Sequence, residues 1–160
     1  MNPSHSDRSA LGPSLQRAWV GYHRRLDDAM AAAGFADRSF PDTRVLRLCR
    51  DGEATVAQIG RELGITRQGA GKIVASLVAR RYVTLKPSSA DAREKLVTLT
   101  SRAVDYLAAQ RAAARRIERE VRRRVGDDAF ETFADVLGAI GGGEQPRMRD
   151  YVRRMAAREL

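Results

Sequence analysis

The fold is decided by residues 55–99, which read TVAQIGRELGITRQGAGKIVASLVARRYVTLKPSSADAREKLVTL. Apolar residues recur at helical spacing over residues 56–63, and Gly64 then permits the left-handed conformation that ends a helix. Thr55 and Thr66 are N-cap candidates, because a threonine hydroxyl can accept a hydrogen bond from the backbone of the first helical turn. Two short helices joined at a glycine predict a helix-turn-helix.

The second helix of this unit separates an apolar face from a polar one. The apolar face, expected to pack on the core, carries Ala70, Ile73, Val74, Leu77 and Val78. The opposite face has no acidic side chain and offers groups that can bond to bases or phosphates, on Arg67, Gln68, Lys72 and Ser76. Gly69 and Gly71 each cost a helix about 1 kcal/mol relative to alanine. We interpret them as sites of close backbone approach, to DNA or to a neighbouring helix; a merely solvated polar face is the alternative interpretation.

Two short strands and a polar loop follow the helices and predict a basic hairpin. Lys86, Arg93 and Lys95 supply its positive charge. An arginine at a hairpin tip can enter the narrow, negatively charged minor groove of DNA. Asp91, two residues before Arg93, can hold the guanidinium in a bidentate pair. Basic hairpin tips are also common as plain soluble surface, and the position after two helices is what favours DNA contact here.

These segments resemble the MarR (multiple antibiotic resistance regulator) family of bacterial transcription factors. The likeness rests on the helix-turn-helix, on RVLRLCRDGEATV upstream of it, and on wing residues Asp91, Arg93, Leu96, Val97, Leu99 and Thr100. The resemblance implies a mainly α fold with a small β-hairpin wing (α+β), a winged helix-turn-helix flanked by N- and C-terminal dimerisation helices. It implies that the helix beginning at Thr66 reads the major groove and that Arg93 reads the minor groove. Thr55, Thr66 and Gly69, at the starts of the two helices, are further predicted DNA contacts. It also implies an obligate homodimer, often a repressor that a small molecule releases from DNA.

The chain is expected to form one MarR-type domain with five parts. These are a disordered N-terminus over 1–13, an N-terminal dimerisation helix over 14–35, the winged DNA-binding module over 39–100, C-terminal dimerisation helices over 101–140, and a basic helical tail over 144–160. The amphipathic flanking helices carry more apolar surface than the small winged module needs to cover. This surplus favours a second copy of the chain related by two-fold symmetry.

An aromatic group on the first helix, Trp19, Tyr22 and His23, has two interpretations. It can line a pocket for a small aromatic or lipophilic effector, as the first helix does in some relatives, or it can belong to the core or the dimer interface. Cys49 ends the second predicted helix. Some relatives sense peroxides through a cysteine in the first helix, which this position does not match, so we expect a buried, inert thiol.

Composition favours an anionic partner, because the net charge is +9 and the isoelectric point about 10.7. The positive charge is almost entirely arginine, which suits phosphate and guanine contacts but also follows from a GC-rich genome. A single cysteine excludes an internal disulfide and fits a reducing compartment. The absence of a signal peptide and of a long apolar run predicts a cytoplasmic protein without membrane association. No cofactor, metal or catalytic grouping is predicted, so we do not expect an enzyme.

Three functions remain open from the sequence. The favoured one is a dimeric regulator of transcription, a repressor that binds a pseudo-palindromic double-stranded operator through two recognition helices. The first alternative is a basic architectural or RNA-binding protein with little sequence readout. The second is a protein-interaction adaptor with a winged fold, for which acids on the recognition face would be expected; that face has none.

Overall fold

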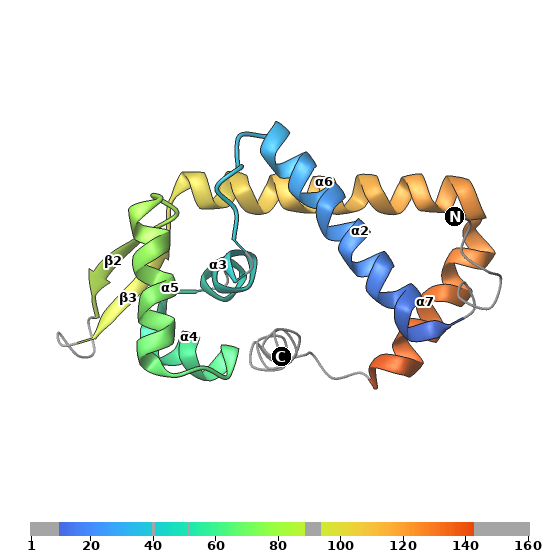
Figure 1. Cartoon of the computed structure of the whole chain (residues 1–160). Helices are drawn as coiled ribbons and strands as arrows, with labels where there is room; N and C mark the ends of the chain where they lie inside the picture. Colours follow the sequence, from blue (N-terminus) through green and yellow to red (C-terminus); the bar gives the residue numbers. More distant parts are fainter. Residues whose placement is uncertain (1–9, 40, 51, 89–93, 143–160) are drawn as a thin grey trace.

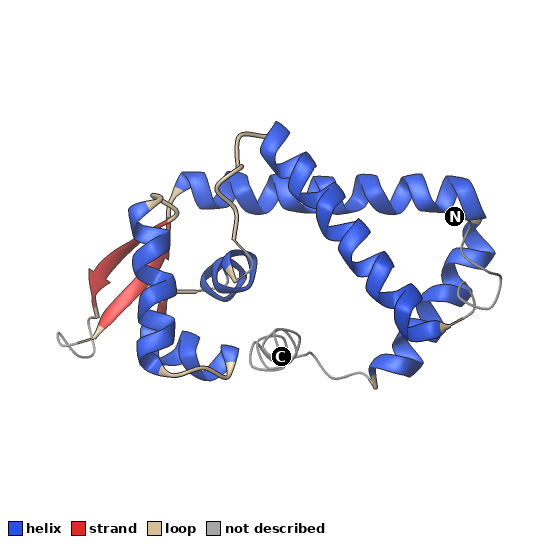
Figure 2. Cartoon of the chain, viewed as in Figure 1, coloured by secondary structure: helices blue, strands red, loops and turns tan. Residues whose placement is uncertain are grey.

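The computed structural model describes residues 10–39, 41–50, 52–88 and 94–142. Along the chain it has α2 (Leu11–Ala32), α3 (Asp42–Arg50), β1 (Ala54–Thr55), α4 (Val56–Leu63), α5 (Arg67–Ala79), β2 (Val83–Pro87), β3 (Lys95–Leu99), α6 (Ser101–Val125) and α7 (Asp127–Gly141). Figure 1 shows the long α6 joining the winged part, built from α3, α4, α5 and the strands, to α7 at its far end. The predicted class, mainly helical with a small sheet, is confirmed (Figure 2).

The helix-turn-helix forms because each of its three boundaries has a residue suited to it. The Thr55 hydroxyl accepts a hydrogen bond from the backbone N–H of Gln58 (3.2 Å), and the Gln58 side chain accepts one in return from the Thr55 backbone (2.7 Å). Gly64 ends α4 at φ 67°, in the left-handed region. Thr66 then caps α5 by accepting from the N–H of Gly69 (3.0 Å). All three boundary residues are predicted by the sequence.

Close contact between α4 and α5 depends on Gly60. A Cβ at this position would lie 3.2 Å from the Ile65 carbonyl oxygen and 3.5 Å from the Ala70 side chain. On α5, the side chains of Ala70, Val74 and Leu77 are buried as predicted. Val78, which we expected on the packed face, is instead 37% exposed. Its place at the edge of the apolar stripe, close to the helix end, leaves it beyond the reach of the core.

The wing is part of a three-stranded antiparallel sheet in the order β1-β3-β2. The hairpin pairs Val83 with Leu99 and Leu85 with Val97, and Ala54 in β1 pairs with Val97 from the other side. The sequence does not predict β1, because two residues are too few to show the alternation that reveals a strand. Its effect is to tie the start of α4 to the wing.

The first helix begins at Leu11, three residues before the predicted start. Residues 11–13, which we expected to be disordered with the rest of the N-terminus, therefore form its first turn; Pro13 is tolerated there because the first-turn N–H groups have no helical acceptor. Residues 1–9 and the predicted tail over 144–160 lie outside the described residues.

The core joins the winged part to the flanking helices. Tyr82, just before β2, and Tyr106 on α6 are both buried, with ring centroids 5.3 Å apart in an edge-to-face arrangement. Phe35 packs edge-on against Tyr106 at 5.5 Å. On α2, Leu26 and Met30 enter the same core. Thr100 caps the start of α6, because its hydroxyl accepts a hydrogen bond from the backbone N–H of Ala103 (3.3 Å).

Candidate nucleic-acid interface

A groove of about 570 Å³ opens where the start of α4, the first turns of α5 and the wing meet. It is lined by Thr55, Val56, Ala57, Arg67, Gln68, Gly71, Glu94 and Lys95. Four residues predicted as DNA contacts, from three separate parts of the chain, are thereby brought together: Thr55, Arg67, Gln68 and Lys95. Their convergence follows from the cap that starts α4 and from the pairing of β1 with β3.

The start of α5 presents Arg67 and Gln68 to solvent. Both side chains are exposed, and the first turn contains no acidic residue. The unpaired N–H groups of a helix start carry partial positive charge, which favours an anion at this point. An arginine can make a bidentate contact with guanine and a glutamine can make one with adenine. This end of α5 can therefore bind both the phosphate backbone and base edges.

The other predicted contacts surround this groove without lining it. Lys72 and Lys86 are exposed on α5 and β2. Thr66 and Gly69 form the turn that starts α5, where the threonine hydroxyl is engaged as the cap. Ser76 lies two turns further along the helix, and its hydroxyl accepts a hydrogen bond from Arg80 (3.2 Å). The two predicted wing-tip residues, Asp91 and Arg93, lie outside the described residues.

Three lining residues were missed by the sequence reasoning: Val56, Ala57 and Glu94. Glu94 matters most, because it places an acid in a basic groove. Its backbone carbonyl accepts from the N–H of Ser88 (3.0 Å), which fixes where the loop rejoins the wing. A carboxylate repels phosphate but can accept a hydrogen bond from the cytosine amino group. In the sequence, Glu94 is recognisable only as an acidic neighbour of Arg93. No periodicity at this point of the chain indicates that its side chain faces α5.

Gly71 faces open space in the groove, since a Cβ there would meet nothing within 4 Å. Of the two interpretations left open for this glycine, approach to a neighbouring helix is therefore not supported. Gly69 differs, because a Cβ there would lie 3.3 Å from the Thr66 hydroxyl. The open space on Gly71 is available to a ligand that reaches the backbone of α5.

Replacing Gly71 with alanine should stabilise the fold and weaken DNA binding. The gain in the free energy of unfolding should be up to about 1 kcal/mol, the helix-propensity difference between the residues. The loss in binding should be about 1–3 kcal/mol, as for other overpacked contacts. Thermal unfolding and duplex titration measure the two effects. Gly12→Ala is the control, because Gly12 also lies in a helix where a Cβ would meet nothing within 4 Å. Unchanged DNA affinity in Gly71→Ala would contradict close approach of DNA to the backbone of α5.

The aromatic group on α2 borders a second, more apolar hollow. Trp19 and His23 have ring centroids 4.1 Å apart, and Tyr22 meets His23 edge-on at 5.6 Å. Trp19 and Tyr22 line a hollow of about 710 Å³ between α2, α6 and α7, together with Phe133 and Leu137. His23 does not line it; burial, followed by the charge of the nearby guanidinium of residue 38, lowers the pKa of this imidazole.

Cys49 is buried on α3, and burial raises the pKa of its thiol to about 11. The reactive species of a cysteine is the thiolate, which this environment disfavours at neutral pH. Within the described ranges, no cluster of three or more His, Cys, Asp or Glu residues could hold a metal ion. None of the helices in the described part of the chain combines the length and apolar character that a membrane span requires.

A helix-turn-helix followed by a strand hairpin, with an exposed basic and hydrogen-bonding start on its second helix, defines the class of winged-helix DNA-binding proteins. Within that class, the model of the MarR family matches residues 36–94 of this chain. The matched segment contains the whole helix-turn-helix.

Solved structures similar to this chain extend the likeness beyond the winged module. One is the transcriptional repressor CouR bound to a 23-mer DNA duplex, at 22% identity and a TM-score of 0.66, covering 88% of this chain and 99% of that one. Wild-type MarR from E. coli in its apo form matches at 19% identity and a TM-score of 0.61, covering 82% and 96%. A mutant of S. aureus MepR bound to an oligodeoxyribonucleotide matches at 14% identity and a TM-score of 0.60, covering 85% and 99%. At these identities the structural likeness shows the fold. No curated protein sequence matches the chain.

Proposed function

We propose that the protein is a dimeric, sequence-specific repressor that binds a pseudo-palindromic operator and is released by a small-molecule effector. The observation that carries the proposal is the groove that gathers Thr55, Arg67, Gln68 and Lys95 at the exposed start of α5. In this mode the start of α5 enters the major groove, with Arg67 and Gln68 on base edges and the lysines on phosphates. The site of action is the cytoplasm, where a bacterial regulator meets its DNA.

The dimer proposal rests on apolar surface that the described chain leaves uncovered. No residue of α7 is buried, and Phe133, Val136, Leu137 and Ile140 are all exposed. An isolated helix of this length is marginal in water, and most helices are stabilised by packing of an apolar face. A second copy that covers α7 would supply that packing and would place two recognition helices on one operator.

The effector proposal rests on the apolar hollow beside Trp19 and Tyr22, which has the size and lining of a small-molecule site. An aromatic or lipophilic compound is the class of ligand it fits. Repression is supported by analogy with CouR, itself a transcriptional repressor of the same fold. Transcription in vitro from a promoter that carries the operator tests this step: the protein should lower transcript yield, and an effector should restore it. An increase in yield would identify an activator.

Arg93 is proposed to contact the minor groove from the wing tip, next to the major groove that α5 occupies. Arg93→Ala should weaken binding to the operator by about 1 kcal/mol or more and leave the dimer intact. Anisotropy titration measures the affinity, and sedimentation measures the dimer. Arg111→Ala, which removes an exposed arginine of α6, controls for the loss of one positive charge. Equal affinities of the two variants would rule out the wing contact.

A further inference from the structure

A buried ion pair with surrounding hydrogen bonds lies at the C-terminal end of α5, away from the groove proposed to bind DNA. Asp42, the first residue of α3, is completely buried. Its carboxylate accepts from the backbone N–H of Ser39 (2.7 Å) and from the Ser39 hydroxyl (2.8 Å). It also accepts from both terminal nitrogens of Arg80 at 2.6 and 2.9 Å, a bidentate pair. Arg80 is the C-cap of α5, so this pair anchors the end of the helix opposite to the groove.

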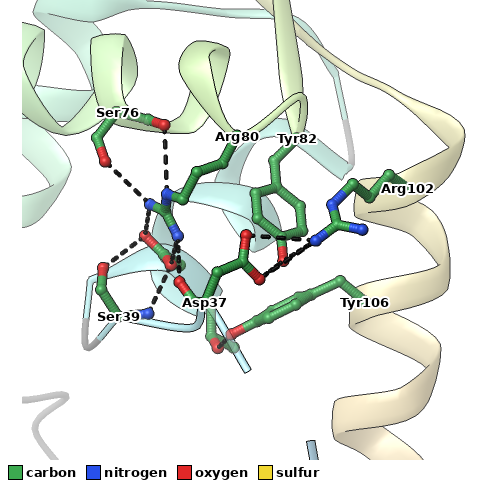
Figure 3. A network of polar contacts seen from close by, with 9 residues as sticks. Asp37, Ser39, Ser76, Arg80, Tyr82, Arg102 and Tyr106 are labelled. Atoms are coloured by element: carbon green, nitrogen blue, oxygen red, sulfur yellow. Dashed lines mark hydrogen bonds and ion pairs between the residues drawn. The ribbon is translucent and has the colours of Figure 1, made fainter. Parts of the chain in front are cut away.

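The Arg80 guanidinium has an acceptor for each of its five N–H groups. Besides the two bonds to Asp42, it donates to the Asp37 backbone carbonyl (2.8 Å), to the Ser76 hydroxyl (3.2 Å) and to the Ser76 carbonyl (3.3 Å). This arrangement needs a planar, five-donor cation, which lysine cannot replace. The pair thus fixes both the position and the rotation of the guanidinium on the end of α5 (Figure 3).

The segment between α2 and α3, which carries Asp37 and Ser39, is also held by α6. The Asp37 carboxylate accepts from the Tyr82 hydroxyl (2.7 Å) and from Arg102 on α6 (3.2 Å). The Arg102 guanidinium lies over the Tyr82 ring, 4.8 Å from its centroid. Burial, followed by the bond to Asp37, raises the pKa of Tyr82 to about 12, so its hydroxyl remains a donor at neutral pH. One short segment therefore links the end of α5 to the start of α6.

Burial separates the Asp42–Arg80 pair from the other ion pairs of the described chain. The two side chains are 1% and 20% exposed, against 36% and 40% for the Asp37–Arg102 pair. An exposed ion pair adds little to the free energy of unfolding. A buried ion pair also adds little net stability, but it can hold one geometry against the alternatives. A fixed geometry matters most where a helix must meet DNA at a set angle.

We propose that Asp42 and Arg80 are a positioning pair that sets the angle of α5 relative to α6 and thereby the spacing of the two recognition helices on an operator. The proposal rests on the dimeric, operator-binding function. Each protomer of the proposed dimer contributes one α5, and α6 runs from the winged part to α7, the helix that we propose packs against the second copy (Figure 1). Adding one base pair between half-sites rotates one by about 35° and shifts it by about 3.4 Å. A rigidly held α5 cannot follow that change, and a loosened α5 can.

The test measures binding as a function of half-site spacing. The full-length wild-type protein first selects its operator from a random duplex pool, and duplexes with one base pair added or removed at the centre are then titrated. The variants are Arg80→Lys, which keeps the charge and loses the fork, and the double variant Asp42→Asn with Arg80→Gln, which leaves no buried charge unpaired. Arg102→Lys is the matched control: it makes the same substitution on α6, in the more exposed ion pair with Asp37, and leaves the buried Asp42–Arg80 pair intact.

We expect the wild type and Arg102→Lys to lose about tenfold or more in affinity per base pair of altered spacing. Arg80→Lys and the double variant should lose about threefold or less, because both lack the bidentate fork. If these variants lost affinity equally at all spacings, or kept the spacing preference of the wild type, the pair would contribute only to the stability of the fold and the positioning role would be wrong. If Arg102→Lys weakened the dependence of affinity on half-site spacing equally, the effect would belong to the whole segment between α2 and α3, and the proposed role of the Asp42–Arg80 pair would be wrong. If the wild type selects no two-part site, the proposed dimeric function fails instead.

Discussion

Introducing glutamate at both Val136 and Ile140 is expected to convert the proposed dimer into a folded monomer. The two side chains are 46% and 49% exposed in the single chain and lie outside the lining of the apolar hollow, so the substitutions remove little packing within it. In a dimer that covers α7 they would lose apolar burial and leave two charges without partners, and unpaired buried charges are strongly destabilising. The free energy of dimer formation should become less favourable by about 3 kcal/mol or more, so the dissociation constant of the dimer should rise ~100-fold or more. Sedimentation velocity over a concentration series measures it.

Val104→Glu is the matched control for this variant. Val104 is also an exposed apolar residue, 56% accessible, but it lies on the first turn of α6, far from α7 along that helix. Circular dichroism should show that both variants remain helical. A dimer that persists unchanged in the double glutamate variant would contradict the use of the α7 face.

Replacing Arg67 and Gln68 together with alanine should abolish discrimination between the operator and other duplexes. A bidentate contact to a base contributes about 1–3 kcal/mol of discrimination, so losing two should lower operator affinity roughly 100-fold or more. Binding to a scrambled duplex should fall far less, since it depends on overall charge. Because both side chains are exposed, thermal stability should not change. Competition titration with operator and scrambled duplexes measures the ratio.

A double control separates readout from charge in this experiment. Arg111→Ala with Gln16→Ala makes the same chemical change on exposed positions of α6 and α2, outside the groove. It should keep the operator preference of the wild type. If the groove variant loses affinity for both duplexes by the same factor, Arg67 and Gln68 contact only phosphates and the base-readout assignment is wrong.

The local features of the winged module could be predicted from the sequence because they depend on neighbours in the chain. The two threonine caps and the glycine at Gly64 each act within three or four residues, so spacing alone reveals them. The strand β1 escaped prediction because it pairs with the distant strand β3, where Ala54 lies opposite Val97. Two residues of such a strand carry no periodicity.

The candidate site was predictable only in part for the same reason. Arg67 and Gln68 follow directly from the helix pattern, whereas Glu94 enters the groove through the register of the sheet. The bidentate pair of Asp42 and Arg80 joins residues 38 positions apart. No local rule distinguishes this arginine from the many others of the chain. Tertiary packing, which brings the start of α3 against the end of α5, makes the pair.

Sequence-specific DNA binding by this protein can be tested in a single titration. The full-length protein is titrated by fluorescence anisotropy against the duplex enriched from a random pool and against a scrambled duplex of the same composition, over a salt series. We expect a preference of about a thousandfold or more at physiological salt, with the affinity for both duplexes falling as salt rises. Equal binding to both duplexes at every salt concentration would contradict the claim and would favour an architectural or RNA-binding protein.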